Sequence, residues 1–143
     1  MKVVVDTNVI VSGLLWGGPP NRILRWAREG TLEIVACEET TSELRRVTQY
    51  KRFSKRLSDL NTSSNEVFSY FMNLVKFVPT PEIIPDVIKK DQFDNIFLAL
   101  ALANKAHLIV SGGRHLLDLR EYKTIQIVMP SEATRVIETL LTG

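Results

Sequence analysis

Short apolar segments alternate with longer stretches of helical character along the chain. The apolar segments predict buried β-strands over residues 1–6, 32–36, 76–78, 108–110 and 125–128. The first of them contains three consecutive valines and no alternating polar position, which is typical of a strand covered on both faces in the middle of a parallel sheet. The strand is expected to end at Asp6.

Helix start and stop signals fall between these strands. Asn21 is placed to cap a helix that ends at Gly30, and Ser63 with Glu66 matches a capping box. Further helices are expected from residue 38 onward, over 93–103, and from a cap at Ser131 to residue 141, whereas the three prolines in 79–90 indicate an extended loop. Strands alternating with helices predict an α/β protein, a three-layer α/β/α sandwich with a mostly parallel sheet.

Composition narrows the class of protein. The 143 residues are 45% apolar, enough for the core of one ordinary domain, so we expect a single domain over 1–143. Cys37 is the only cysteine, which excludes an internal disulfide and suggests a small buried side chain. The chain opens directly on a strand, with neither a signal-peptide pattern nor an apolar run of about 20 residues, so we expect a cytoplasmic protein without a membrane span.

Three polar residues, Asp6-Thr7-Asn8, follow the first predicted strand. In parallel α/β sheets, ligands bind beyond the carboxyl ends of the strands, which would place the Asp6 carboxylate at a binding edge. The alternative is that these side chains only form the turn that starts the next helix. One carboxylate cannot hold a divalent cation against water, so the binding hypothesis requires partner acids elsewhere.

Two further acids, Glu43 and Asp94, occur where helices are expected to begin. Helix N-termini and strand carboxyl ends share one edge of an α/β sheet, so both acids are candidates to converge with Asp6 around Mg²⁺ or Mn²⁺. Each also has a structural explanation. Thr40 with Glu43 fits a capping box, and Asp91 or Asp94 fits the N-cap of the apolar helix.

A basic segment over 45–56 contains Arg45, Arg46, Lys51 and Arg52, with Tyr50 and Phe53 interleaved and no acid. Such a segment can follow a phosphate backbone while its aromatic side chains stack on unpaired bases. A basic helix face is also common where it only faces solvent. The net charge of +2 does not by itself indicate a nucleic-acid-binding protein.

Four segments together resemble the PIN-domain family. They are residues 3–10, 41–44, 90–101 and 108–112, which read VVVDTNVI, TSEL, KDQFDNIFLALA and LIVSG. The resemblance runs nearly end to end, and the most similar branch is a bacterial group of toxins from toxin-antitoxin pairs. It implies a Mg- or Mn-dependent ribonuclease that hydrolyses single-stranded RNA with a metal-activated water, and partners that include an antitoxin protein and a second copy of the chain.

The resemblance also implies roles for individual residues. Asp6, Glu43 and Asp94 would be the catalytic carboxylates that bind the metal. The supporting residues would be Asn8, which orients Asp6, together with Thr7, Ser111 and Asp91.

The chain departs from the family pattern after the fourth predicted strand. Similar members read Ser-Gly-Asp-x-Asp-Leu there, whereas this chain reads Ser111-Gly112-Gly113-Arg114-His115-Leu116, so that Gly113 replaces an acid. His115 is a candidate substitute ligand for Mn²⁺ or another transition ion, although a lone loop histidine is more often a surface residue, the interpretation favoured here. The missing acid leaves a second function open: a PIN fold with weakened or lost catalysis that serves as an RNA-binding or protein-interaction module.

Overall fold

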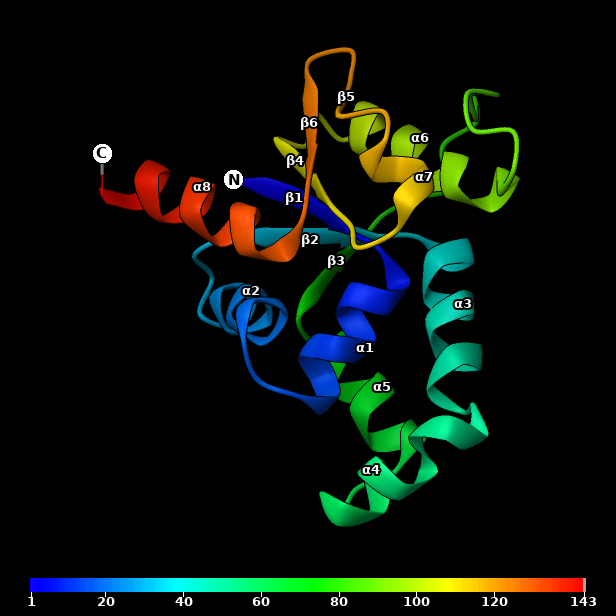
Figure 1. The fold of residues 1–143 in the computed structure, drawn as a ribbon, viewed down its shortest axis with the longest axis vertical. Coiled ribbons are helices and arrows are strands. Elements are labelled where there is room, and N and C mark those ends of the chain that lie inside the picture. Colours follow the sequence, from blue (N-terminus) through cyan, green and yellow to red (C-terminus); the bar gives the residue numbers. More distant parts are fainter. Residues whose placement is uncertain (143) are drawn as a thin grey trace.

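A six-stranded sheet forms the centre of the molecule (Figure 1). The computed structural model describes residues 1–142. The strands are β1 (Lys2–Val5), β2 (Glu33–Ala36), β3 (Val75–Phe77), β4 (Leu108–Val110), β5 (Glu121–Tyr122) and β6 (Ile125–Val128). Their order is β3-β2-β1-β4-β6-β5, with every neighbouring pair parallel except β5 and β6.

The strand order creates a switch point beside β1. The chain moves outward from β1 to β2 and β3, and it then returns to the other side of β1 with β4. Val5 of β1 lies opposite Val110 of β4, so the residues that follow these two strands emerge side by side. This is where ligands bind in open α/β sheets.

Helices cover both faces of the sheet, which confirms the predicted three-layer α/β/α architecture. One layer contains α1 (Thr7–Leu15), α2 (Pro19–Arg28), α5 (Ser64–Met72) and α8 (Pro130–Thr142), and it continues into α3 (Glu38–Thr48) and α4 (Ser54–Asp59). The other layer is built on α6 (Asn95–Ala103) with α7 (Arg114–Leu117). Two short 3₁₀ turns, η1 (Lys51–Phe53) and η2 (Gln92–Asp94), precede α4 and α6.

Burial on both faces explains the unbroken valine run in β1. Val3 and Val5 belong to the core beneath α1, α2 and α8, whereas Val4 belongs to the core beneath α6. Successive side chains of a strand point to opposite faces, so a strand with helices on both sides needs an apolar residue at every position. Cys37 is fully buried in the second core, as expected for a small apolar side chain.

Several predicted element boundaries are wrong. The second helix starts at Pro19 with Gly18 as its N-cap, and the side chain of Asn21 instead donates to the carbonyl of Gly13 at 2.9 Å. The last helix starts at Pro130, so Ser131 is inside it and is not its cap. Proline is well suited to a first helical turn because its missing N–H has no partner there in any case.

The strand β6 was predicted over 125–128, whereas β5, its hairpin with β6, and α7 were not predicted. Lys123 takes the left-handed conformation in the hairpin turn, with φ of 55°, a conformation usually signalled by Gly or Asn. The strand β5 has only two residues, so it gives no periodic pattern. The predicted domain range of 1–143 extends to Gly143, which lies outside the described residues.

None of the helices within residues 1–142 combines the length and the apolar composition needed to cross a lipid bilayer.

Candidate active site

Asp6 lies at the carboxyl end of β1 and is also the N-cap of α1. Its Oδ1 accepts a hydrogen bond from the Val9 amide at 3.0 Å, and its Oδ2 accepts one from the hydroxyl of Ser111, which follows β4. Asp6 is 7% exposed and Ser111 is fully buried. The two interpretations of Asp-Thr-Asn are therefore compatible, because the carboxylate that starts the helix also lies at the binding edge.

Glu43 reaches the same place from α3. Its Oε1 accepts a hydrogen bond from the hydroxyl of Thr7, and its Oε2 lies 3.9 Å from the guanidinium of Arg46. The capping-box explanation of Glu43 is wrong, since Cys37 is the N-cap of α3 and its amide donates to the hydroxyl of Thr40 at 3.0 Å. Glu43 is consequently free of a capping role and lines the pocket with Asp6.

Asp91 and Asp94 arrive from η2, just before α6. They occupy N-cap positions, but neither side chain makes a capping hydrogen bond to the backbone. Together with His115 of α7 they form a group whose metal-ligating atoms all lie within 4.8 Å of one another, and His115 Nδ1 is 3.9 Å from Asp94 Oδ2. Asp6 and Glu43 line the same pocket but are outside this close group.

Asn95 holds this acidic turn in place, and sequence reasoning missed it. Its buried amide group accepts from the amides of Val87 and Ile88, at 3.2 and 2.8 Å, and donates to the carbonyls of Ile88 and Gln92. These bonds tie the long loop after β3 to the start of α6, and so they fix Asp91 and Asp94 at the pocket. A polar residue at the first position of an otherwise apolar helix was the available signal.

The four acids and His115 line one open pocket of about 460 Å³, which Arg46, Arg52 and Arg114 also border. Burial raises the pKa of Asp94 to about 6, with further increases from the negative charges of Asp91, Asp6 and Glu43 and a decrease from His115. Burial is also the main cause of the raised pKa of Asp6, against which the Ser111 hydroxyl and the backbone amides act. The pKa of Glu43 is raised by burial and lowered by the Thr7 hydrogen bond and Arg46.

This donor set fits a divalent cation. Carboxylate side chains of Asp6, Glu43, Asp91 and Asp94 line one pocket. Burial raises the pKa of Asp6, Glu43 and Asp94, and repulsion by neighbouring acids adds to the effect at Glu43 and Asp94. A hard or borderline cation favours the charged forms of these acids. The geometry thus supports a metal site, and it groups Asp91 and His115, predicted as a supporting residue and a possible substitute ligand, with Asp94.

Asn8 and Gly113 differ in what they contribute. Asn8 is exposed at the pocket, and among the described residues the hydrogen bonds to Asp6 come from Ser111, Val9 and the glycine amides instead. Gly113 borders the Asp6 side of the pocket. A Cβ atom there would lie 3.5 Å from Ser111 Oγ and 3.9 Å from Asp6 Oδ2, so a side chain at this position would point toward Asp6.

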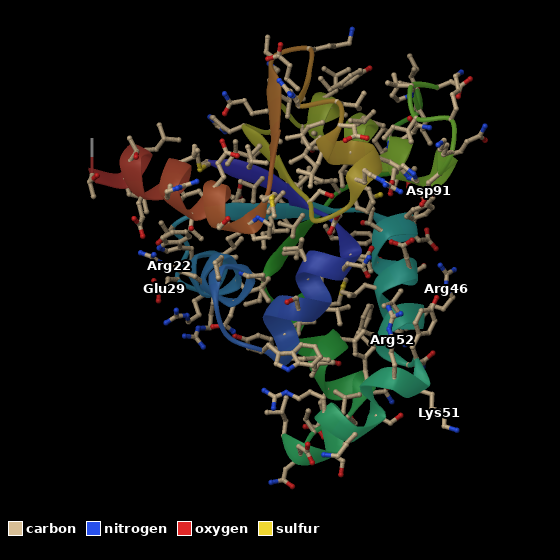
Figure 2. All side chains as sticks on the ribbon, viewed as in Figure 1. Arg22, Glu29, Arg46, Lys51, Arg52 and Asp91 are labelled. Atoms are coloured by element: carbon tan, nitrogen blue, oxygen red, sulfur yellow. The ribbon has the colours of Figure 1, made fainter. Side chains whose placement is uncertain are left out.

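The basic segment divides into two parts. Arg46 and Arg52 line the pocket, and Figure 2 shows them with Lys51 along α3 and η1, on the side of the molecule where Asp91 lies. Arg45 turns away, with its guanidinium 4.2 Å from the centre of the Phe68 ring. The four residues predicted to bind RNA therefore do not form a single surface.

We expect Ser111→Ala to destabilise the protein by about 1 to 3 kcal/mol, because the buried Asp6 carboxylate loses a hydrogen-bond donor. Urea unfolding in the presence of a chelator measures this change. Ser42→Ala, at an exposed position of α3, is the control and should stay within about 0.5 kcal/mol of wild type. Equal stability of the two variants would show that the Ser111 hydroxyl does not hold Asp6.

Comparison with known proteins places this fold and pocket in a family. The fold is a mostly parallel sheet between two layers of helices, with acids gathered at the switch point of the sheet. The family model of the PIN domain matches residues 2–115. The chain belongs to the PIN-domain family. A solved structure with a similar fold is VapBC2 from Rickettsia felis bound to a DNA fragment from their promoter. It has a TM-score of 0.55 and 14% identity, over 89% of this chain and 97% of that one. A search of curated proteins gave no match.

Proposed function

We propose that this protein is a metal-dependent ribonuclease that hydrolyses single-stranded RNA. The observation that carries the proposal is the convergence of Asp6, Glu43, Asp91 and Asp94 on one pocket whose border is cationic. Acids in such number have no structural need to meet, since burial, and after it the negative charges of the neighbouring acids, raises the pKa of Asp94 to about 6. Membership of the PIN-domain family makes nuclease chemistry the activity to test.

In this proposal the acids of the pocket hold a divalent metal ion, and two hydroxyl side chains orient the acids. A bound Mg²⁺ or Mn²⁺ ion supplies a polarised water and offsets charge on the phosphoryl oxygens. The carboxylates of Asp6, Glu43 and Asp94 hold it, while Ser111 and Thr7 fix the orientation of Asp6 and Glu43 through their hydroxyl hydrogen bonds.

Two arginine side chains that line the pocket beside the acids bind the RNA. Arg46 and Arg52 contact the phosphates that flank the scissile bond, and the open pocket admits an unpaired strand. Tyr50 lines the same pocket, with the Arg52 guanidinium 5.4 Å from its ring centre, and offers an aromatic surface to an unpaired base.

The proposed partners follow from the toxin-antitoxin resemblance. We expect a small antitoxin protein to neutralise the enzyme in the cytoplasm, and we expect the chain to form a homodimer. The similar structure contains VapBC2, bound to a DNA fragment from their promoter, which favours a search for a protein partner of this chain. Co-purification of the chain with the product of a neighbouring gene tests this proposal.

A second candidate function is an RNA-binding or protein-interaction module with little or no catalysis. Gly113 favours it, because the position that points toward Asp6 carries no acid. The four remaining carboxylates at the pocket oppose it.

Cleavage of a single-stranded RNA, with Mg²⁺ or Mn²⁺ and with a chelator, tests the two candidates. The ribonuclease proposal expects metal-dependent cleavage that Asp6→Asn and Asp94→Asn remove. The second candidate is favoured if the wild-type protein cleaves RNA no faster than Asp6→Asn does, while Gly113→Asp gains cleavage. The chain would then be an RNA-binding or protein-interaction module with little or no catalysis.

Removal of the pocket arginines should change the salt dependence of RNA binding. Arg46→Gln with Arg52→Gln removes two phosphate contacts, so the slope of log affinity against log salt should become shallower by about 1.4. Fluorescence anisotropy with a labelled RNA, in chelator to prevent cleavage, measures the slope. Arg45→Gln is the matched control, since Arg45 stacks on Phe68, and its slope should equal that of wild type. A change only in the Arg45 variant would place the RNA on another face of α3.

A further inference from the structure

We propose that His115 is a metal ligand, and that it makes this site prefer Mn²⁺ to Mg²⁺. The inference rests on the proposed metal-dependent function and specifies which ion serves it. Its basis is the group formed by Asp91, Asp94 and His115, the described residues whose ligating atoms come within 4.8 Å of one another. The group contains two carboxylates and one imidazole.

The spacing of these three side chains suits a common ion. Ligand atoms that share one such ion lie at most about 4 Å apart, since each is about 2.1 Å from the metal. The observed 4.8 Å limit exceeds this by less than one ångström, and Asp91 is exposed, so rotation of its side chain can close the difference. His115 Nδ1 already lies 3.9 Å from Asp94 Oδ2.

The position of Gly113 explains why an imidazole would matter here. An acid at 113 would point toward Asp6 Oδ2, and its absence leaves the Asp6 side of the pocket with less negative charge. His115, two residues later, enters the pocket on the Asp94 side. Compared with a site that has an acid at position 113, this pocket offers one oxygen ligand fewer near Asp6 and one nitrogen ligand, from His115 of α7, near Asp94.

The identity of the donor sets the choice of ion. Mg²⁺ requires oxygen ligands in nearly ideal octahedral geometry and keeps most of its waters, so an imidazole contributes little to its binding. Mn²⁺ binds most weakly among the divalent ions from Mn²⁺ to Zn²⁺, but as a transition ion it accepts imidazole nitrogen as well as carboxylate oxygen. His115 therefore strengthens Mn²⁺ binding and leaves Mg²⁺ binding almost unchanged.

The test uses Mn²⁺ itself as the probe, bound to the full chain. Pulsed electron paramagnetic resonance of Mn²⁺ detects ¹⁴N coupling from a directly bound imidazole, and titration calorimetry gives the affinities for Mn²⁺ and Mg²⁺. Wild type should show the ¹⁴N coupling, and His115→Ala should lose it. We also expect His115→Ala to weaken Mn²⁺ binding by about 10-fold or more and Mg²⁺ binding by less than about 3-fold.

The sequence provides a matched control in its only other histidine. His107 is exposed and precedes β4, at the opposite end of that strand from Ser111, so His107→Ala should keep both the coupling and the affinity. Bound Mn²⁺ without ¹⁴N coupling in wild type overturns the role of His115, as does equal Mn²⁺ affinity in His115→Ala, and both leave the ribonuclease proposal intact. Absence of Mn²⁺ and Mg²⁺ binding to wild type overturns both proposals.

Discussion

Asp94→Asn should abolish RNA cleavage while it stabilises the metal-free protein. Asp94 is grouped with Asp91 and His115 and is close enough to Asp6 and Glu43 for their charges to raise its pKa, so loss of its charge removes a ligand shared by the acidic pocket. We expect cleavage to fall by at least about 100-fold at saturating RNA. The same substitution removes a repelled, partly buried charge, and we expect it to add about 1 kcal/mol to the free energy of unfolding in chelator, after allowance for solvent screening.

The pH dependence of stability provides the second half of this prediction. The pKa of Asp94 is about 6 in the folded chain, above its ordinary value of 3.8. Between these two pH values the folded state binds more protons than the unfolded state, so the free energy of unfolding should fall as the pH rises from about 4 to about 6. Asp94→Asn should flatten this part of the curve, and added Mn²⁺ should reverse the loss at higher pH.

Asp59→Asn is the control, because this acid of α4 is exposed and pairs with Lys55 away from the pocket. Its cleavage rate and its stability curve should match those of wild type. If Asp94→Asn retained full cleavage, or if it destabilised the chelated protein as Ser111→Ala is expected to do, Asp94 would be a structural residue and the proposed metal site would be wrong.

The edge of the sheet at which the pocket lies could be predicted from the sequence, because parallel strands that are neighbours in a sheet all end at the same edge. Asp6 and Ser111 each follow a continuous apolar run, and adjacent parallel strands bring their carboxyl ends together. The central strands and the three layers followed from the same alternation of strands and helices. Placement of these residues needed no knowledge of side-chain conformation.

The remaining geometry depends on features that a linear pattern does not contain. Cys37 is an unusual N-cap, so Thr40 was assigned to the wrong partner and Glu43 was given a capping role that it does not have. Arg45 and Arg46 are adjacent in sequence but point about 100° apart on a helix, which is why only Arg46 reaches the pocket. The approach of Asp91 to His115 depends on how the loop after β3 returns to α6, and Asn95 fixes that path through buried hydrogen bonds.

Gly113→Asp should increase Mg²⁺ affinity and Mg²⁺-supported cleavage by about 10-fold. The backbone at Gly113 is extended, with φ of −87°, and a Cβ atom there makes ordinary contacts with Ser111 and Asp6, so the new side chain fits without strain. Aspartate is also favourable at the N-cap of α7, which Gly113 occupies. The added carboxylate would restore an oxygen ligand on the Asp6 side, where the chain now lacks one.

Gly112→Asp is the control for the added charge, because nothing lies within 4 Å of a Cβ atom at that position. It should leave Mg²⁺ affinity near the wild-type value, as measured by calorimetry and by cleavage rates across a Mg²⁺ titration. Equal gains in the two variants would mean that any negative charge near the pocket attracts the ion. A gain confined to Gly113→Asp would show that this position is a missing ligand site, and that the present chain has lost Mg²⁺ affinity through a single side chain next to Asp6.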